Sequence, residues 1–162
     1  MSDQGETRRI VQRGLYFEEF EEGALYAHAP GRTVTEADNV LFTTLTMNTQ
    51  SLHLDAAWSA GTEFGERLVN SMFTLSTLVG LSVAQLTQGT IVANLGFESV
   101  RFPAPVRVGD TLYAETLVTE KRLSSSRPGQ GIVEFAHTMR NQRGEVVAEA
   151  TRKTLMLCRP QE

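Results

Sequence analysis

The strongest constraint on the fold is a change in hydrophobic periodicity close to Gly89. Before this residue, positions 69–86 place apolar side chains all around a helical projection, with small residues such as Ser76 and Gly80 between them. A helix that is apolar on every side is typically a buried helix. After Gly89, apolar residues alternate with polar or small ones, which is typical of strands with one buried face. The pattern predicts a buried helix followed by a sheet.

The alternating pattern covers four segments, at residues 91–97, 112–118, 133–139 and 147–157. Turn-forming residues separate them at 103–109, 124–129 and 141–144. Connections this short imply antiparallel pairing, because parallel strands need long crossovers. We therefore expect an α+β fold in which an antiparallel sheet wraps around one long buried central helix.

The first half of the chain predicts shorter elements. Residues 1–14 are polar and lack periodicity, which is typical of a flexible tail. Residues 24–34 predict an extended segment interrupted at Pro30 and Gly31. Thr35 and Asp38 match the spacing of a capping box, and apolar residues follow at helical spacing, so we expect a helix over residues 35–46. Asp55 predicts a second, short helix immediately after it.

Composition excludes several classes of function. A chain of 162 residues is long enough for one domain with a real core. Its net charge of −4 argues against nucleic acid as a partner, because phosphate binding needs a basic surface. The one cysteine, Cys158, excludes an intrachain disulfide framework. The polar N-terminus does not resemble a signal peptide, and residues 69–86 are too polar to span a membrane. We expect a cytoplasmic protein without membrane contact.

Three histidines are the first candidates for chemistry. His28 and His137 lie in predicted strands, and we interpret both as packed, hydrogen-bonded core residues. His53 differs because it lies in a polar loop between two predicted helices, where functional residues often gather. His53 and Cys158 cannot by themselves supply the three or four ligands of a zinc site, so we expect no metal.

Four segments make the chain recognisable. Residues 46–55 read T-M-N-T-Q-S-L-H-L-D, close to the pattern T-G-D-x-N-P-x-H-x-D. A Phe64–Gly65 pair follows, and residues 69–72 read V-N-S-M where the pattern has V-H-G-M. Residues 102–112 read F-P-A-P-V-R-V-G-D-T-L, close to F-x-x-P-V-x-x-G-D-T-L. In these segments the chain resembles the MaoC-like dehydratases, including the (R)-specific enoyl-CoA hydratases. The resemblance spans residues 15–157 and implies a single hot-dog domain over residues 15–159.

The resemblance also implies roles for individual residues. His53 matches the family's catalytic histidine, and Asn48 stands where the family has a catalytic aspartate. An asparagine holds a water but cannot carry a proton near neutral pH, so His53 would move protons alone or through that water. Ser71 replaces a glycine whose backbone N–H is thought to hold the thioester oxygen, and Asn70 replaces the histidine before it.

The same resemblance predicts the character of the pocket. Asn70, together with Asn48, Gln50 and Ser51, would make it rich in amides and hydroxyls. Such a pocket suits a short polar acyl group better than a long alkyl chain, and Met72 is a further candidate to contact the substrate. Arg67, next to the pocket helix, is a candidate to bind a distal carboxylate.

The implied activity is that of a lyase. It would add or remove water across the double bond of a short enoyl-CoA, branched or dicarboxylic, such as mesaconyl- or itaconyl-CoA. A hot-dog acyl-CoA thioesterase and a non-catalytic acyl-CoA-binding protein are the alternatives, because one fold hosts several functions. The resemblance implies no cofactor, with the CoA thioester as substrate, and a homodimer or dimer of dimers. Basic side chains of the second half are candidates to bind the CoA phosphates: Arg101, Arg107, Arg122, Arg127 and Arg143.

Overall fold

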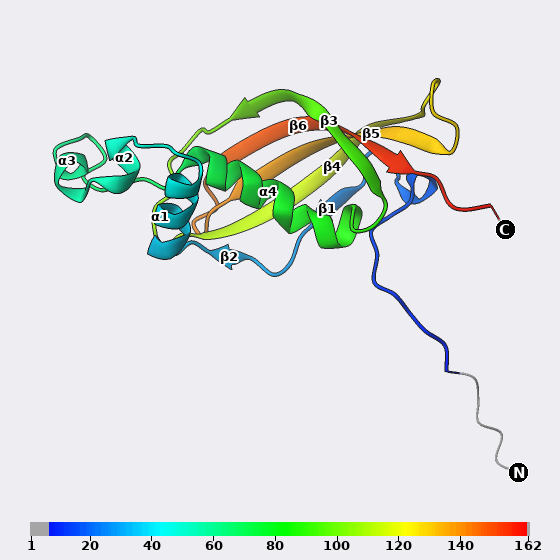
Figure 1. The fold of residues 1–162 in the computed structure, drawn as a ribbon, viewed down its shortest axis with the longest axis horizontal. Helices are drawn as coiled ribbons and strands as arrows, with labels where there is room; N and C mark the ends of the chain where they lie inside the picture. The colour runs from blue at the N-terminus through cyan, green and yellow to red at the C-terminus, as the bar shows by residue number, and fades with distance from the viewer. Residues whose placement is uncertain (1–6, 162) are drawn as a thin grey trace, which may run out of the picture.

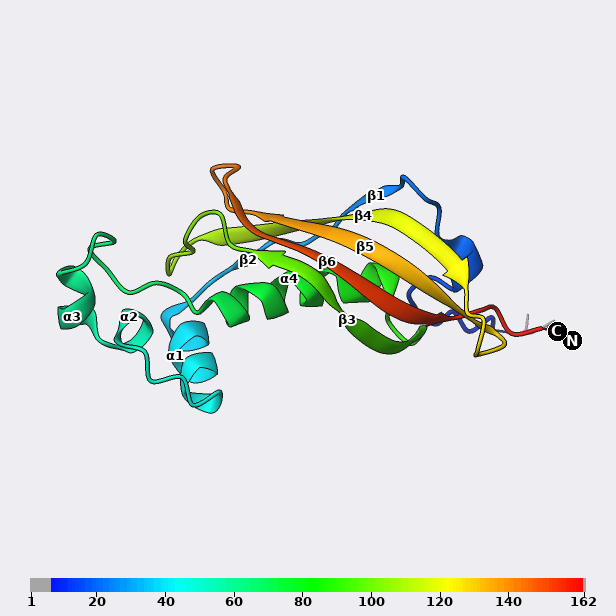
Figure 2. The same cartoon turned by 90° about the horizontal axis from the view of Figure 1, so that it is seen from above.

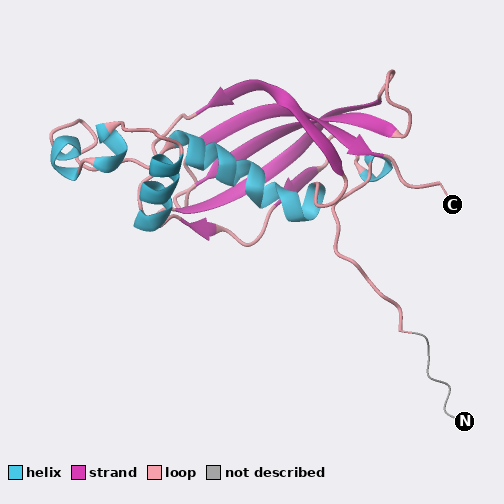
Figure 3. Ribbon diagram, viewed as in Figure 1, coloured by secondary structure: helices cyan, strands magenta, loops and turns pink. Residues whose placement is uncertain are grey.

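A computed structural model describes residues 7–161 of the chain (Figure 1). Their first half forms short elements, and their second half forms one long helix and four long strands (Figure 3). In chain order the elements are η1 (Phe17–Glu19), β1 (Leu25–Ala27), β2 (Arg32–Thr33), α1 (Glu36–Leu45), α2 (Ser51–Leu54), α3 (Ala56–Ala60), α4 (Ser71–Leu86), β3 (Ile91–Arg101), β4 (Thr111–Leu123), β5 (Gln130–Arg140) and β6 (Val146–Leu157). The order of one long helix and then four strands agrees with the sequence pattern.

The strands form one antiparallel sheet in the order β1-β4-β5-β6-β3, and β2 pairs with the start of β4. Helix α4 lies along one face of this sheet, and no helix of the described residues covers the other face (Figure 2). The strand β3 forms one edge of the sheet, and most of its residues are exposed. The α+β class and the antiparallel sheet predicted from the sequence are confirmed.

Helix α4 is buried on one side only. Its buried residues Thr74, Leu78, Ser82 and Leu86 repeat every four positions and face the sheet. On the opposite side Met72 keeps 47% of its surface exposed, and the small residues there are exposed too. The prediction of a helix buried all round is therefore wrong for a single chain. The helix also begins at Ser71 rather than at residue 69, because Asn70 caps it.

The core between α4 and the sheet has two apolar parts with a polar layer between them. Leu78, Leu112, Met139 and their neighbours form one part, and Phe20, Phe135 and their neighbours form the other. Between them a hydrogen-bonded series runs through Gln85, His28, Thr116, His137 and Arg152. The last four of these residues are at most 6% exposed. The interpretation of His28 and His137 as satisfied core histidines is confirmed.

The hydrogen bonds in this layer fix the position of each proton. Arg152 Nε can only donate, so His137 Nε2 accepts from it at 2.9 Å and the proton of the neutral ring lies on Nδ1. His137 Nδ1 then donates to Thr116 Oγ1, and Thr116 donates to His28 Nε2, each over 2.7 Å. Burial, the Arg152 guanidinium and His28 lower the pKa of His137 to about 3, so the ring is neutral at physiological pH.

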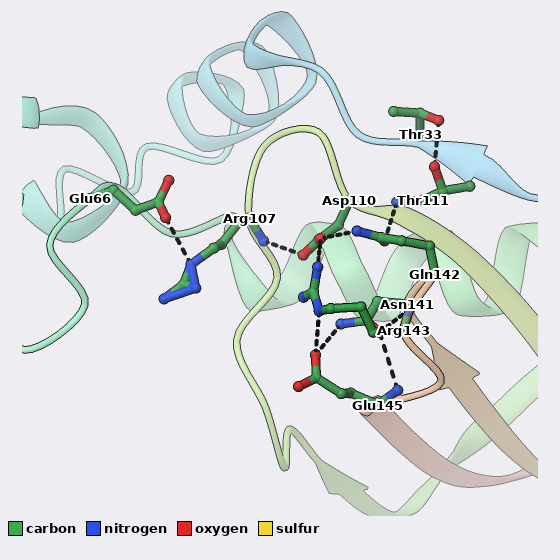
Figure 4. Close-up of polar contacts among 9 residues, drawn as sticks. All are labelled: Thr33, Glu66, Arg107, Asp110, Thr111, Asn141, Gln142, Arg143 and Glu145. Carbon is green, nitrogen blue, oxygen red and sulfur yellow. Dashed lines mark hydrogen bonds and ion pairs between the residues drawn. The ribbon is translucent and has the colours of Figure 1, made fainter.

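The sequence motif over residues 102–112 includes the turn before β4, and its Gly109 and Asp110 have structural roles there. Gly109 has φ of +92°, a conformation that favours glycine. Asp110 is 4% exposed and accepts from the Arg107 backbone N–H, the Gln142 amide and the Arg143 guanidinium (Figure 4). Burial opposes ionisation of this carboxyl, but the three donors outweigh it and lower the pKa of Asp110. Asp110 therefore joins this turn to the β5–β6 turn.

The helices α1, α2 and α3 extend beyond one end of the sheet (Figures 1 and 2). The predicted capping box of α1 is confirmed, since Thr35 and Asp38 bond each other's backbone N–H. His53 was expected in a loop, but it lies in the one-turn helix α2. A four-residue helix is too short to show periodicity, which is why the sequence did not reveal it.

The predicted tail, residues 1–14, lies partly outside the described residues, which begin at 7. The described part of it contains no helix or strand, and at its end Gly14 N–H donates to the carbonyl of Gln88. Within residues 7–161, no helix has the length and apolar character needed to cross a membrane.

Candidate active site

A pocket of about 440 Å³ lies where α2, the N-terminus of α4 and the β3–β4 connection meet. This volume is within the usual range for small-molecule sites. Its lining is mainly apolar, and its three polar side chains are His53, Ser71 and Thr74. The apolar lining comes from Leu52, Phe64, Leu68, Val69, residues 102–106 and Val147. The sequence predicted His53 and Ser71, but it gave no reason to select Thr74.

The His53 ring has a defined orientation. Its Nδ1 lies 2.9 Å from the backbone carbonyl oxygen of Leu68. Because a carbonyl can only accept, Nδ1 carries the proton of the neutral ring and Nε2 is the basic nitrogen. The Leu68 N–H donates in turn to the Leu52 carbonyl, so the segment before α4 runs beside α2. This arrangement provides a base at the pocket wall.

The N-terminus of α4 supplies the second polar feature of the pocket. Asn70 is the cap residue, and its side-chain oxygen accepts from the Met72 N–H at 2.9 Å. Ser71 is the first helical residue and lines the pocket. Backbone N–H groups in the first turn of a helix, together with its dipole, favour a developing negative charge. The change from glycine to Ser71 keeps this backbone donor.

A buried amide that sequence reasoning missed connects these two features. Asn39 in α1 is completely buried and bonds to the backbones of His53, Leu68 and Asn70. Thr43, one turn later and also completely buried, accepts from the Asn70 side chain at 3.2 Å. The sequence signal that could have found Asn39 and Thr43 was their spacing, two polar residues four positions apart in a predicted helix.

Several predicted site residues do not line the pocket. Asn48 is half-buried, and its side-chain oxygen accepts from the Gln50 N–H at 3.0 Å, which shapes the loop before α2. Gln50 is exposed. Arg67 forms an ion pair with Glu36 and lies at a separate, smaller cavity. Met72 and Asn70 are likewise absent from the pocket lining.

The pocket therefore lacks the expected amides, and the hydroxyl-bearing residues in its lining are Ser71 and Thr74. Asn70 is buried, and its side chain bonds to Met72 and Thr43 instead of facing the pocket. No arginine or lysine lines the pocket among the described residues. Several candidate CoA-binding arginines also have acidic partners: Arg101 pairs with Glu149, and Arg107 with Glu66 (Figure 4). Over residues 7–161, no group of three or more metal-ligating side chains gathers.

Solved structures define the class of fold. A Mycobacterium tuberculosis protein described as having a double hot-dog fold superposes with a TM-score of 0.80 at 25% identity, covering 92% of this chain and 46% of that one. The sheet with one long helix on its face is a hot-dog fold. One copy of that fold therefore accounts for nearly the whole chain.

Sequence relatives define the family within this fold. Residues 19–140 match the MaoC-like domain, and the chain belongs to that family. The mesaconyl-CoA hydratase of Haloarcula marismortui is 32% identical over 161 residues, covering 97% of this chain and 43% of the relative. The (R)-specific enoyl-CoA hydratase of Rhodospirillum rubrum is 33% identical over 105 residues, covering 64% of this chain and 69% of the relative. The chain spans less than half the length of several curated relatives that it matches.

Proposed function

We propose that the protein is a lyase that adds water to the double bond of a short enoyl-CoA, or removes it from the 3-hydroxyacyl-CoA. One observation carries this proposal: a histidine with a fixed tautomer lies in the same apolar pocket as the first turn of a helix. A base and a donor for an oxyanion are the two groups that the reaction needs. The family and the named hydratase relatives support the same reaction.

In the hydration direction, His53 Nε2 takes a proton from water while the water oxygen adds to Cβ. The negative charge that develops on the thioester oxygen is stabilised by the Ser71 backbone N–H and the dipole of α4. The proton held by His53 is then delivered to Cα, which completes the addition of one water and restores the neutral ring. Asn48 contributes by shaping the loop before α2, since its amide cannot carry a proton near neutral pH.

The substrate class follows from the pocket and the relatives. A volume of about 440 Å³ accommodates a short acyl group and its thioester but not the whole CoA. Relatives named mesaconyl-CoA hydratase and β-methylmalyl-CoA dehydratase support a short branched dicarboxylic acyl group. The pocket lining supplies no cation for the distal carboxylate, so that charge would lie toward the pocket mouth or a second copy.

We also propose that two copies pair along β3. This edge strand exposes Leu95 by 51% and Phe97 by 39%, and the outer side of α4 exposes Met72. An exposed edge with apolar side chains favours pairing with another strand. Light scattering on the purified protein tests this proposal, and a monomer at micromolar concentration would contradict it.

The test of activity uses crotonyl-, octenoyl- and mesaconyl-CoA, following loss of the conjugated double bond and, separately, release of free thiol. We expect hydration of the short substrates without thiol release, and a rate about 10²–10⁴-fold lower for His53→Ala. Thr49→Ala is the control, because Thr49 is an exposed neighbour of the same loop that does not line the pocket. Thiol release as the main reaction, or unchanged activity in His53→Ala, would contradict the proposal.

A further inference from the structure

The two halves of the proposed site converge on one buried amide. The Asn39 side-chain nitrogen donates to the carbonyl oxygens of His53, at 3.2 Å, and Leu68, at 3.3 Å. Its side-chain oxygen accepts from the Asn70 backbone N–H at 2.9 Å. One side chain thus contacts the backbone of the base, the carbonyl that orients that base, and the cap residue of α4.

We propose that Asn39 is a positioning residue that fixes the tautomer of His53 and its placement relative to the first turn of α4. This inference rests on the proposed hydratase function. Asn39 does not line the pocket, so it acts through the groups that it holds rather than on the substrate.

The chemistry of the contacts requires an amide. Two carbonyl oxygens need donors and one N–H needs an acceptor, and an asparagine side chain supplies both in a small volume. An aspartate of the same shape keeps the acceptor for Asn70 but turns an anionic oxygen toward the two carbonyls. A leucine fills the space and offers neither. Asn39→Asp therefore removes the donor and keeps the shape, whereas Asn39→Leu removes both the donor and the acceptor and keeps the packing volume.

The coupling to catalysis runs through the Leu68 carbonyl. This oxygen accepts from both Asn39 and His53 Nδ1, so its position sets the position and the tautomer of the ring. Without Asn39, the Leu68 carbonyl loses one of its two donors; the bond from the Leu68 N–H to the Leu52 carbonyl remains, but the carbonyl can turn relative to α2. The imidazole then also populates the Nε2–H tautomer, which has no basic nitrogen facing the water. Displacements of about 1 Å at a reacting group lower rates by up to about 100-fold.

The experiment measures kcat, KM and the His53 tautomer in Asn39→Asp and Asn39→Leu. We expect kcat to fall by about 10–100-fold with KM within about threefold, because the substrate contacts remain. The ring nitrogen shifts of His53 report the tautomer by NMR, and the three histidines of the chain make assignment by His53→Ala direct. The wild type should show the Nδ1–H form, and both variants a mixture.

Asn141→Ala is the matched control for lost stability. Asn141 is 2% exposed, and its side chain also makes three hydrogen bonds, to Arg143 and Glu145 in the β5–β6 turn (Figure 4). We expect this variant to lower stability while keeping kcat and the His53 tautomer. All variants are assayed at a temperature where circular dichroism shows them folded, and Asn39→Asp carries the test if Asn39→Leu does not fold.

Three results would overturn the inference: unchanged kcat in the folded Asn39 variants, an unchanged Nδ1–H tautomer, or an equal loss of kcat in Asn141→Ala. If the wild type hydrates no enoyl-CoA, the proposed function fails, but the tautomer measurement still decides the structural part of the inference. A tautomer mixture in the Asn39 variants then supports that part, and retention of the Nδ1–H form contradicts it.

Discussion

The buried polar layer predicts that this protein loses stability in mild acid. His137 is 2% exposed and has its Nε2 beside the Arg152 guanidinium, so a proton on this ring would place two cations in contact inside the core. Burial, Arg152 and His28 lower the pKa of His137 from 6.5 to about 3. Between these two pH values the unfolded chain binds a proton that the folded chain does not. Acidification therefore favours unfolding.

The size of the stability loss follows from the difference between the pKa values of His137 in the unfolded and folded chain. Below pH 6.5 each further pH unit lowers the free energy of unfolding by about 1.4 kcal/mol, so His137 contributes a loss of about 2 kcal/mol between pH 7 and pH 5. Carboxylates add little in this range because their ordinary pKa values lie near 4. Burial also lowers the pKa of His28, which acts in the same direction.

The assay is urea unfolding at pH 7 and pH 5, on the wild type and on His137→Gln. A glutamine can accept from Arg152 and donate to Thr116 but does not titrate, and the contribution of His28 largely cancels in the comparison. Circular dichroism is the suitable probe, because Trp58 is 51% exposed in α3 and reports poorly on the sheet. An equal loss of stability in both proteins would refute the assignment to His137.

Two further predictions concern the pocket helix and the turn before β4. Ser71→Pro deletes one backbone N–H, and the extended Asn70 (φ −57°, ψ 125°) tolerates a following proline at this first helical position, so kcat should fall about 10²–10³-fold without loss of helix content. Retained activity would show that the Ser71 N–H does not stabilise the thioester oxygen. Asp110→Ala leaves the Arg107 N–H without its acceptor and removes one of the two carboxylates that bind the Arg143 guanidinium, and urea unfolding should show a loss of about 1–3 kcal/mol. A loss below about 0.5 kcal/mol would show that water replaces the carboxylate.

Local chemistry made much of the fold predictable from the sequence. The capping pair Thr35 and Asp38 marked the start of α1, and period-two alternation marked the four long strands. The capping and alternation signals depend on residues close together in the sequence, which is why one sequence was sufficient to find them. The resemblance to the MaoC-like family, and not local chemistry, selected His53 and Ser71, which do line the pocket.

The remaining features depend on contacts between distant segments. Asn48 and Gln50 match family positions in the sequence, yet their loop bonds within itself and the pocket forms without them. The polar layer brings together residues from positions 28 to 152, and no single stretch of sequence reveals it. Thr116 and His137 alternate with apolar residues in β4 and β5, so the pattern predicted their burial but not their partners.

Helix α1 shows most clearly why apolar spacing in the sequence did not identify the residues that support the site. Its apolar spacing predicted a helix, but Leu41 and Leu45 are 61% and 73% exposed, while Asn39 and Thr43 are completely buried. A helix with its polar face inward is stabilised by hydrogen bonds to the segments it contacts, and here those segments carry the proposed base and the proposed oxyanion donor. Its outward apolar face is then available to a second copy. The inverted face of α1 is therefore what we expect of an element that builds a site rather than a core.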